Sequence, residues 1–260
     1  MRKFIIPVIA ITALLFFSCD KKDNARTGAG TASDGRLDNA ASGTALDPGY
    51  VLRIDAGFYT LEADTGSESD KTKWAASMSL GEKVSVGKDR RLTFHGDGKV
   101  YLFTEVRRDD GKEGWAWASQ VASNCELATV IGAKATLCKS ADIVDVTSQM
   151  ISRKTVVALF PETEKNGFVK IKAYDPYVDA PKSYVQNFLH LDNLSRKESD
   201  VRASILLQIA EPLKNEGTDK VRKDALLEEL RSKFSNSVFR YEIMELVNPD
   251  AYFNSMNEID

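Results

Sequence analysis

Residues 100–118 restrict the fold of this chain more than any other segment. Residues 100–106 have the pattern of a strand, in which alternate side chains point to opposite faces. Tyr101, Phe103 and Glu105 therefore share one face. The tetrapeptide DDGK at 109–112 is typical of a tight turn between antiparallel strands, and a second short strand follows it. The segment therefore predicts a β-hairpin. Because an isolated hairpin is only marginally stable in water, more strands must pack with it.

Short apolar alternations interrupted by Gly and Asp continue on the N-terminal side of the hairpin. They predict strands at residues 58–61, 83–86 and 91–94. With the hairpin, these strands predict a small antiparallel barrel between Tyr50 and about Val121.

Two motifs in this region resemble the bacterial Src-homology-3-like domain. Residues 80–86 (LGEKVSV) are similar to the start of a strand in that family, and residues 110–116 (DGKEGWA) are similar to its Gly-Trp hairpin. The resemblance implies a half-open β-barrel. It further implies that Gly114 allows a bend where a side chain would collide, and that Trp115 closes one end of the barrel.

A second, divergent copy of the same pattern follows between residues 127 and 191. Its strands are expected at 155–159, 167–171 and 184–189, roughly 70 residues after their counterparts, which is the length of one such domain. The resemblance thus implies two tandem barrels.

The remaining residues, 193–260, have the apolar periodicity of about three helices. Ser195 and Glu198 have the spacing of a capping box, and the helix that they begin should end near Pro212. A second helix is expected after Thr218 and a third over residues 237–247. We expect this region to pack against the second barrel, because it is short for an independent core. The predicted fold class is therefore mainly β with an α-helical tail.

The N-terminus has the pattern of an export signal. Arg2 and Lys3 precede an uncharged apolar run at residues 4–17, which is too short to span a bilayer comfortably. Ser18-Cys19 closes the run and resembles a bacterial lipobox, in which Cys19 is lipidated and becomes the first mature residue. A plain secretory signal with an incidental cysteine is the alternative. Lipidation would hold the protein on a membrane without crossing it.

Composition then divides the chain into five parts. Residues 1–18 form the signal peptide, and 19–48, rich in Gly, Ala, Ser and Asp, form a lipidated flexible tether. Residues 49–124 and 125–192 form the two barrels, and 193–260 form the helical region.

Charge and residue counts exclude several classes of function. With 35 Lys and Arg against 38 Asp and Glu, the chain has no basic field for nucleic acid. The only histidines are His95 and His190, and the three cysteines are scattered, so we expect no metal site and no cofactor. Neither Cys125 nor Cys138 lies in a nucleophile motif, and no Gly-x-Ser-x-Gly elbow is present. The sequence predicts a protein without catalytic residues.

Cys125 and Cys138 could form a disulfide in an oxidising compartment, or they could remain two buried thiols. The spacing leaves both alternatives open.

Aromatic residues of the first barrel are the candidates for a ligand groove. Trp115 and Trp117 should share one face of their strand, and we expect that face to be the core. If the face is open, Trp117 with Tyr101 and Phe103 could stack on a peptide or a sugar, and Trp74 could join them.

The resemblance implies a non-catalytic binding protein of the bacterial cell envelope, exported and anchored to a membrane by its lipid. The implied partners are peptidoglycan or another envelope protein, with no small-molecule substrate. Two alternatives are an assembly lipoprotein whose helical tail docks on a protein complex, and a surface-exposed adhesin. Docking by the tail would require an exposed apolar patch on these residues: Val238, Phe239, Ile243, Leu246 and Val247.

Overall fold

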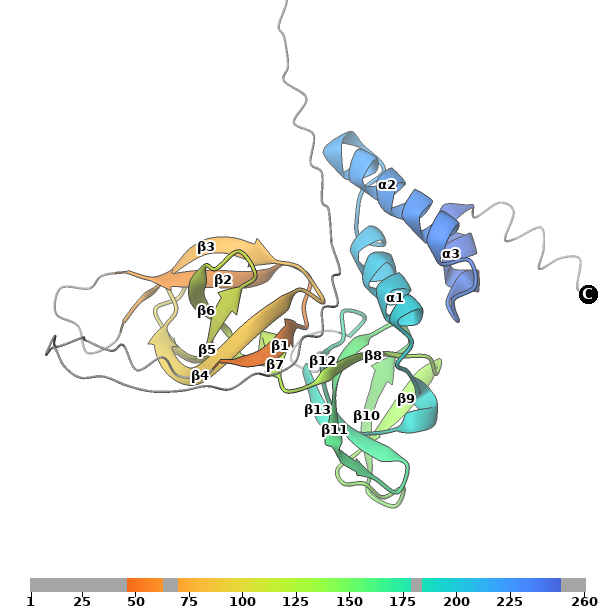
Figure 1. Cartoon of the computed structure of the whole chain (residues 1–260), viewed down its shortest axis with the longest axis horizontal. Helices are drawn as coiled ribbons and strands as arrows, with labels where there is room; N and C mark the ends of the chain where they lie inside the picture. Colours follow the sequence, from red (N-terminus) through yellow and green to blue (C-terminus); the bar gives the residue numbers. More distant parts are fainter. Residues whose placement is uncertain (1–45, 63–69, 179–183, 249–260) are drawn as a thin grey trace, which may run out of the picture. The chain divides into compact units, whose positions relative to one another are not determined.

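The computed structural model describes residues 46–62, 70–178 and 184–248. In this part of the chain, two antiparallel sheets are followed by three α-helices (Figure 1). The predicted class, mainly β with a helical tail, is confirmed. No helix within these ranges has the length and apolar character needed to span a membrane.

The first sheet contains seven strands in the spatial order β3-β2-β6-β5-β4-β1-β7. Their bounds are β1 (Asp47–Val51), β2 (Ala56–Leu61), β3 (Thr72–Met78), β4 (Lys83–Thr93), β5 (Val100–Arg108), β6 (Glu113–Trp117) and β7 (Val121–Ser123). A 3₁₀ turn, η1 (Ala118–Gln120), joins the last two strands. A bridge between Lys71 and Thr93 links the region before edge strand β3 to the end of β4, so the sheet curls back on itself.

The predicted hairpin at residues 100–118 is confirmed as β5 and β6. The two strands predicted at 83–86 and 91–94 are instead one strand, β4. A change of register between Val86 and Asp89 bends this strand while it stays paired with β5. The apolar pattern breaks at the bulge, which is why the sequence suggested two strands.

The second sheet has the same topology as the first. Its strands are β8 (Glu126–Val130), β9 (Lys134–Cys138), β10 (Val146–Ser152), β11 (Val156–Lys165), β12 (Phe168–Tyr174), β13 (Tyr184–His190) and β14 (Leu194–Ser195). Their order is β10-β9-β13-β12-β11-β8-β14, which repeats the first order strand for strand. A 3₁₀ turn, η2 (Leu191–Asn193), again precedes the last strand.

Strand pairing shows which residues occupy equivalent positions in the two sheets. Phe103 pairs with Trp117 in the first sheet, and Phe168 pairs with His190 in the second. Trp117 and His190 also occupy the same N-terminal position at the two 3₁₀ turns. His190 is therefore the counterpart of Trp117.

Each sheet buries an apolar core of its own. The first core consists of Val51, Ala56, Phe58, Met78, Val84, Val86, Val106, Ala116 and Val121. The second is built from the inward-facing residues of β8 to β13, among them Leu137, Ile151, Leu159, Ile171 and Leu189. A side chain at Gly114 would come within 2.5 Å of both the Phe58 ring and the Tyr59 carbonyl oxygen, so only glycine fits there.

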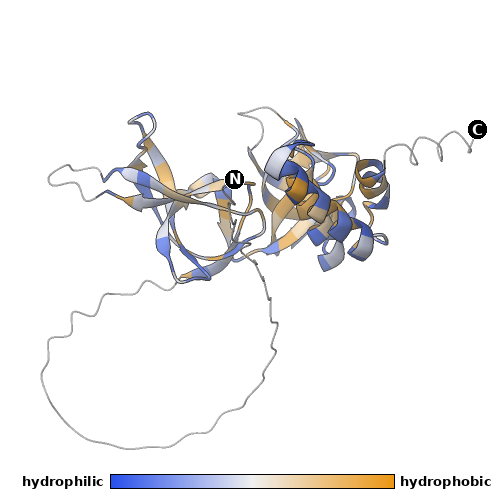
Figure 2. Cartoon of the chain, turned by 90° about the horizontal axis from the view of Figure 1, so that it is seen from above, coloured by the Kyte–Doolittle hydropathy of each residue, from blue (hydrophilic) through white to orange (hydrophobic). Residues whose placement is uncertain are grey.

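The helical tail comprises α1 (Glu198–Ala210), α2 (Gly217–Lys233) and α3 (Arg240–Val247). Apolar and polar residues both occur along each helix (Figure 2). The predicted capping box is wrong, because Lys197 is the N-cap and no side chain caps α1. Ser195 lies in β14, paired with Thr129, and its hydroxyl donates to Asp200 at 2.6 Å.

Helix α1 packs against residues from both sheets. Val201 and Ile205 lie in one cluster with Val156 of β11 and with Leu80, which precedes β4. The helices also form a core of their own around Leu207, Leu230, Phe239 and Ile243. The expected packing of the tail on the second sheet is thus present, together with contacts to the first sheet that the sequence did not indicate.

The apolar residues that docking by the tail would require on the surface are mostly covered in the described part of the chain. Phe239 and Ile243 are buried, Leu246 and Val247 are partly buried against the helical core, and Val238 is exposed. These apolar side chains face inward because α2 and α3 need them for their own packing.

Candidate functional site

Aromatic rings gather on the face of the first sheet opposite its main core. Tyr101 and Trp117 have ring centroids 4.7 Å apart, and Phe103 and Trp117 have centroids 5.3 Å apart. Tyr59 and Phe94 belong to the same cluster. The structure thus brings together the predicted groove residues Tyr101, Phe103 and Trp117. Phe103 is fully buried, so its role here is to support the rings around it.

Trp115 and Trp117 do share a face, but that face is not the main core as predicted. Gly114 and Ala116 are the buried residues of β6, whereas both indoles are partly buried. The reason is the close approach of β6 to Phe58, which leaves no room for a large side chain on the inner face.

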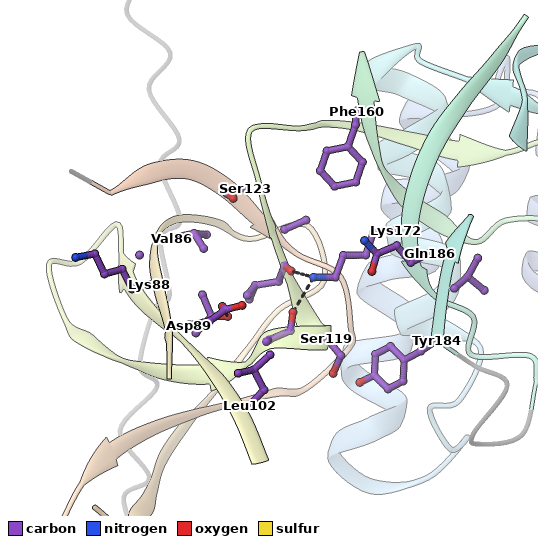
Figure 3. A pocket seen from close by; sticks show the side chains of 16 residues that line it. Val86, Lys88, Asp89, Leu102, Ser119, Ser123, Phe160, Lys172, Tyr184 and Gln186 are labelled. Atoms are coloured by element: carbon purple, nitrogen blue, oxygen red, sulfur yellow. Dashed lines mark hydrogen bonds between the residues drawn. The ribbon is translucent and has the colours of Figure 1, made fainter. Parts of the chain in front are cut away.

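A cavity of about 830 Å³ lies between the two sheets (Figure 3). The first sheet contributes Asp89 and Leu102, and the second contributes Phe160, Lys172 and Tyr184. The Lys172 ammonium donates to the carbonyl oxygens of Ala118 and Val121, each at 2.7 Å. Burial lowers the pKa of Lys172, and the nearby Asp89 carboxylate opposes this effect. Lys172 therefore holds the second sheet to the 3₁₀ turn of the first.

A smaller cavity of about 410 Å³ shares Ser119 and Tyr184 with the first one. We call it the aromatic cavity, because four rings line it, those of Tyr59, Trp74, Trp117 and Tyr184. Trp74 is 55% exposed at this site.

Besides Ser119, the polar residues Arg53, Asp55 and Gln120 line the aromatic cavity. The Trp117 indole N–H donates to the Tyr59 hydroxyl at 3.2 Å, which fixes both rings. Gln120 is only 5% exposed, and its Oε1 has no hydrogen-bond partner among the described residues.

A third cavity, of about 510 Å³, is also lined by Arg53 and Asp55. Here the Tyr177 hydroxyl donates to the Glu211 carboxylate at 2.8 Å, and Lys154 pairs with the same carboxylate. Burial, followed by the Glu211 charge, raises the pKa of Tyr177 well above its ordinary value. This tyrosine stays a neutral donor and has no role as a base.

Sequence reasoning missed several residues of the aromatic cavity. Tyr184 comes from the second sheet, so its contribution depends on packing between the two repeats. Gln120 lies in a 3₁₀ turn, and no pattern in the sequence marks its side chain as buried. Of the aromatic candidates, Trp74 and Trp117 line the cavity, whereas Tyr101, Phe103 and Trp115 do not.

Cys125 and Cys138 are free thiols, so of the two alternatives that their spacing left open, the structure shows the unbridged one. Cys125 lies between β7 and β8 and donates to the Ala122 carbonyl, whereas Cys138 pairs with residues of β10 and β13. Burial raises the pKa of Cys125 to about 12, and it also raises the pKa of Cys138. Cys19 lies outside the described residues.

Each histidine packs on an aromatic ring. His95 packs on Phe94, with ring centroids 4.7 Å apart, and His190 packs on Phe168 at 4.9 Å. The His190 Nδ1 accepts a hydrogen bond from the Asp192 backbone. The described ranges hold no cluster of three or more His, Cys, Asp or Glu side chains placed to bind a metal ion.

Comparison with known proteins gives little further information. No protein-family model matches the chain, and no curated protein sequence does. Two solved structures from Trichomonas vaginalis, NlpC2 and NlpC1, match 64% and 67% of this chain. Each has 10% sequence identity and a TM-score of 0.22, and each match covers 55% of the other chain. This degree of similarity is too low to indicate a family or an activity.

Proposed function

We propose that this protein is a non-catalytic lipoprotein of the bacterial cell envelope that binds a cell-wall component or an envelope protein. In this proposal the two sheets are tandem Src-homology-3-like barrels. Two observations support that assignment, namely the identical strand order of the two sheets and the Gly-Trp hairpin of β5 and β6.

The observation that carries the proposed function is the aromatic cavity between the sheets. Two indole rings, those of Trp74 and Trp117, line this cavity. Trp74 is largely exposed, and Trp117 is only partly buried. The topology does not require an indole at this place, because the second sheet has His190 at the equivalent position. A ring that the fold does not need, at the edge of a cavity, is well suited to ligand contact.

The thiol environments support a non-catalytic role. A thiol acts as a nucleophile in its thiolate form, and burial disfavours that form at both Cys125 and Cys138. Among the described residues no hydrogen bond joins either thiol to a histidine, and the Cys125 thiol donates to the Ala122 carbonyl oxygen.

The envelope location rests on the N-terminal sequence. Lipidation of Cys19 would anchor the protein, and the residues between Cys19 and β1 would serve as a tether between the lipid and the first sheet, which begins at Asp47 and so includes the last two residues of the predicted tether. Substitution Cys19→Ser tests this part of the proposal. We expect the variant to lose membrane attachment in cell fractionation, whereas a lipid-modified, membrane-bound form of the variant would contradict it.

The binding function can be tested by co-sedimentation with purified cell-wall sacculi. The protein without its first 19 residues should sediment with sacculi at low and at moderate salt, because aromatic contacts are less sensitive to salt than surface charge pairs. Trp117→Ala should reduce the bound fraction. Tyr241→Ala is the matched control, since this exposed ring lies on α3.

The two variants also distinguish the alternatives. If the protein does not bind sacculi, its ligand should be an envelope protein. That protein should then be captured from envelope extract by the wild type and captured less by Trp117→Ala. If capture depends on Tyr241 and not on Trp117, docking through the helical tail replaces binding at the cavity.

A further inference from the structure

Trp74 is the ring of the aromatic cavity that takes least part in the packing of the fold. Its indole is 55% exposed, and it packs on no other ring in the described part of the chain. Trp117, by contrast, contacts the rings of Phe94, Tyr101 and Phe103. The cavity therefore offers a ligand a flat indole surface that no other ring of the described chain uses.

A β-bulge places Trp74 on this side of the sheet. Between β2 and β3, Phe58 pairs with Ala76. The next pair is Tyr59 with Trp74, so one residue of β3, Ala75, is left over. Without this extra residue, Tyr59 would pair with Ala75, and Trp74 would point to the opposite face of the sheet. The bulge thus brings an exposed indole to the face that carries Tyr59 and the cavity.

Asp55 supplies a negative charge at the same cavity. Its side chain is exposed and belongs to no ion pair among the described residues. Among the described residues that line the cavity, the one cation is Arg53. Its guanidinium stacks on the Tyr174 ring, with 4.7 Å between the central carbon and the ring centroid. Because Tyr174 lines the third cavity and not the aromatic one, the charged end of Arg53 is held towards the third cavity. The Asp55 carboxylate remains for a cation of the ligand.

The rings and the carboxylate favour the same kind of group. The face of an aromatic ring attracts a cation placed over it, and the attraction is strongest for tryptophan. The Trp117 N–H is already donated to the Tyr59 hydroxyl at 3.2 Å, so this indole offers apolar surface and not a donor. An ammonium on an alkyl chain uses both properties, because its methylene groups pack on the rings while its charge faces Asp55. An anionic ligand would be repelled by the same carboxylate.

We propose that the aromatic cavity binds the alkylammonium side chain of a lysine-type residue in a peptide ligand. This inference rests on the proposed binding function and names the chemical group that the ligand presents. The ammonium lies over the Trp74 ring near Asp55, and the aliphatic part of the side chain packs on Trp117 and Tyr184. Wall peptides and envelope proteins can both supply such a group, so the experiments distinguish these two sources.

Two blocked peptides that differ only in the ammonium test the proposal. Acetyl-Ala-Lys-Ala-amide and its norleucine analogue are titrated into ¹⁵N-labelled protein without residues 1–19, and the indole N–H signals are followed by NMR. The lysine peptide should shift the Trp74 and Trp117 signals to saturation, and Trp115, which does not line the cavity, should shift least. The norleucine peptide should bind clearly more weakly. Equal affinity for the two peptides, or no saturable shift of Trp74, would overturn the proposal.

Asp55→Asn tests the charge at the cavity. Asp55 has φ +52°, a conformation that asparagine also tolerates, so the variant should keep its melting temperature. Its affinity for the lysine peptide should fall about threefold, as expected for the loss of one exposed charge pair, whereas binding of the norleucine peptide should not change. Asp109→Asn is the matched control, because it makes the same change of charge at an exposed residue that does not line the cavity. Equal losses in the two variants would show that overall charge, and not Asp55, attracts the peptide.

Acetylated sacculi separate this inference from the wider function. Acetic anhydride converts the free amines of wall peptides into neutral amides, so sedimentation that is lost on acetylation supports the ammonium site with the wall as its source. If native and acetylated sacculi bind equally and the lysine peptide does not bind, the ammonium site is wrong and the proposed wall binding stands. If the lysine peptide binds but native sacculi do not, the ammonium site stands and wall binding is wrong. The lysine peptide should then compete with the capture of an envelope protein.

Discussion

The carboxylate of Asp200 is the best place to test how the helical tail is held. Asp200 lies in the first turn of α1 and is 2% exposed. Its two oxygens accept hydrogen bonds from the Ser195 hydroxyl at 2.6 Å, the Ser237 hydroxyl at 2.8 Å and the Val238 backbone N–H at 3.1 Å. One side chain therefore connects β14, α1 and the segment that leads to α3.

The size of the effect follows from these three hydrogen bonds. Hydrogen bonds to a charged group contribute about 1.5–3 kcal/mol each, but bonds that share one acceptor are not additive. For Asp200→Ala we expect a loss of about 3–5 kcal/mol in the free energy of unfolding. Asp200→Asn keeps one acceptor and the shape of the side chain, so it should lose about 1–2 kcal/mol. Urea denaturation at pH 7, followed by circular dichroism, measures both values.

The pH dependence gives a second, independent test. Burial of Asp200 disfavours its charged form, but the hydrogen bonds from Ser195, Val238 and Ser237 outweigh burial and lower the pKa. The stabilisation is then present above the unfolded-state pKa of about 3.9 and is lost as the pH falls through the lower folded-state pKa. The stability difference between the wild type and Asp200→Asn should therefore be constant from pH 7 to about pH 5 and shrink below about pH 4. A difference that grows on acidification would refute this reasoning.

Three further predictions concern the rings, the thiols and one glycine. Phe103→Ala should lower the free energy of unfolding by about 3–5 kcal/mol, and Trp115→Ala by clearly less, because only Phe103 is fully buried; equal losses in urea denaturation would contradict this. Native Cys125, with a pKa of about 12, should be roughly 10⁻⁴ thiolate at pH 8, so iodoacetamide should label it far more slowly than it labels the unfolded chain. Gly81→Ala should lower the melting temperature and cost about 1–2 kcal/mol, since Gly81 has φ +77° and its new methyl would lie 2.6 Å from Ile205.

Local signals were sufficient for much of the fold. The turn around Gly111, which has φ +80°, and the alternation beside it specify the β5–β6 hairpin without help from distant residues. The apolar periodicity likewise predicted α1, α2 and α3. Both kinds of pattern arise from contacts between residues that are close in sequence.

Long-range contacts decided what the sequence could not show. Alternation predicted that Trp115 and Trp117 share a face, but the approach of Phe58 to Gly114 determines which face is inside. Ser195 has capping-box spacing, yet its pairing with Thr129 places it in a strand. The aromatic cavity depends on Tyr184 and Gln120, which come together only when the two repeats pack.

Because both sheets contribute to the aromatic cavity, the site is composite, and neither repeat contains it alone. Its existence is thermodynamically linked to the pairing of the repeats through Lys172 and through the apolar cluster around α1. A ligand that binds only the paired state would stabilise that pairing by an amount that grows with the logarithm of ligand concentration. Occupancy of the cavity would thus make the two repeats more resistant to separation.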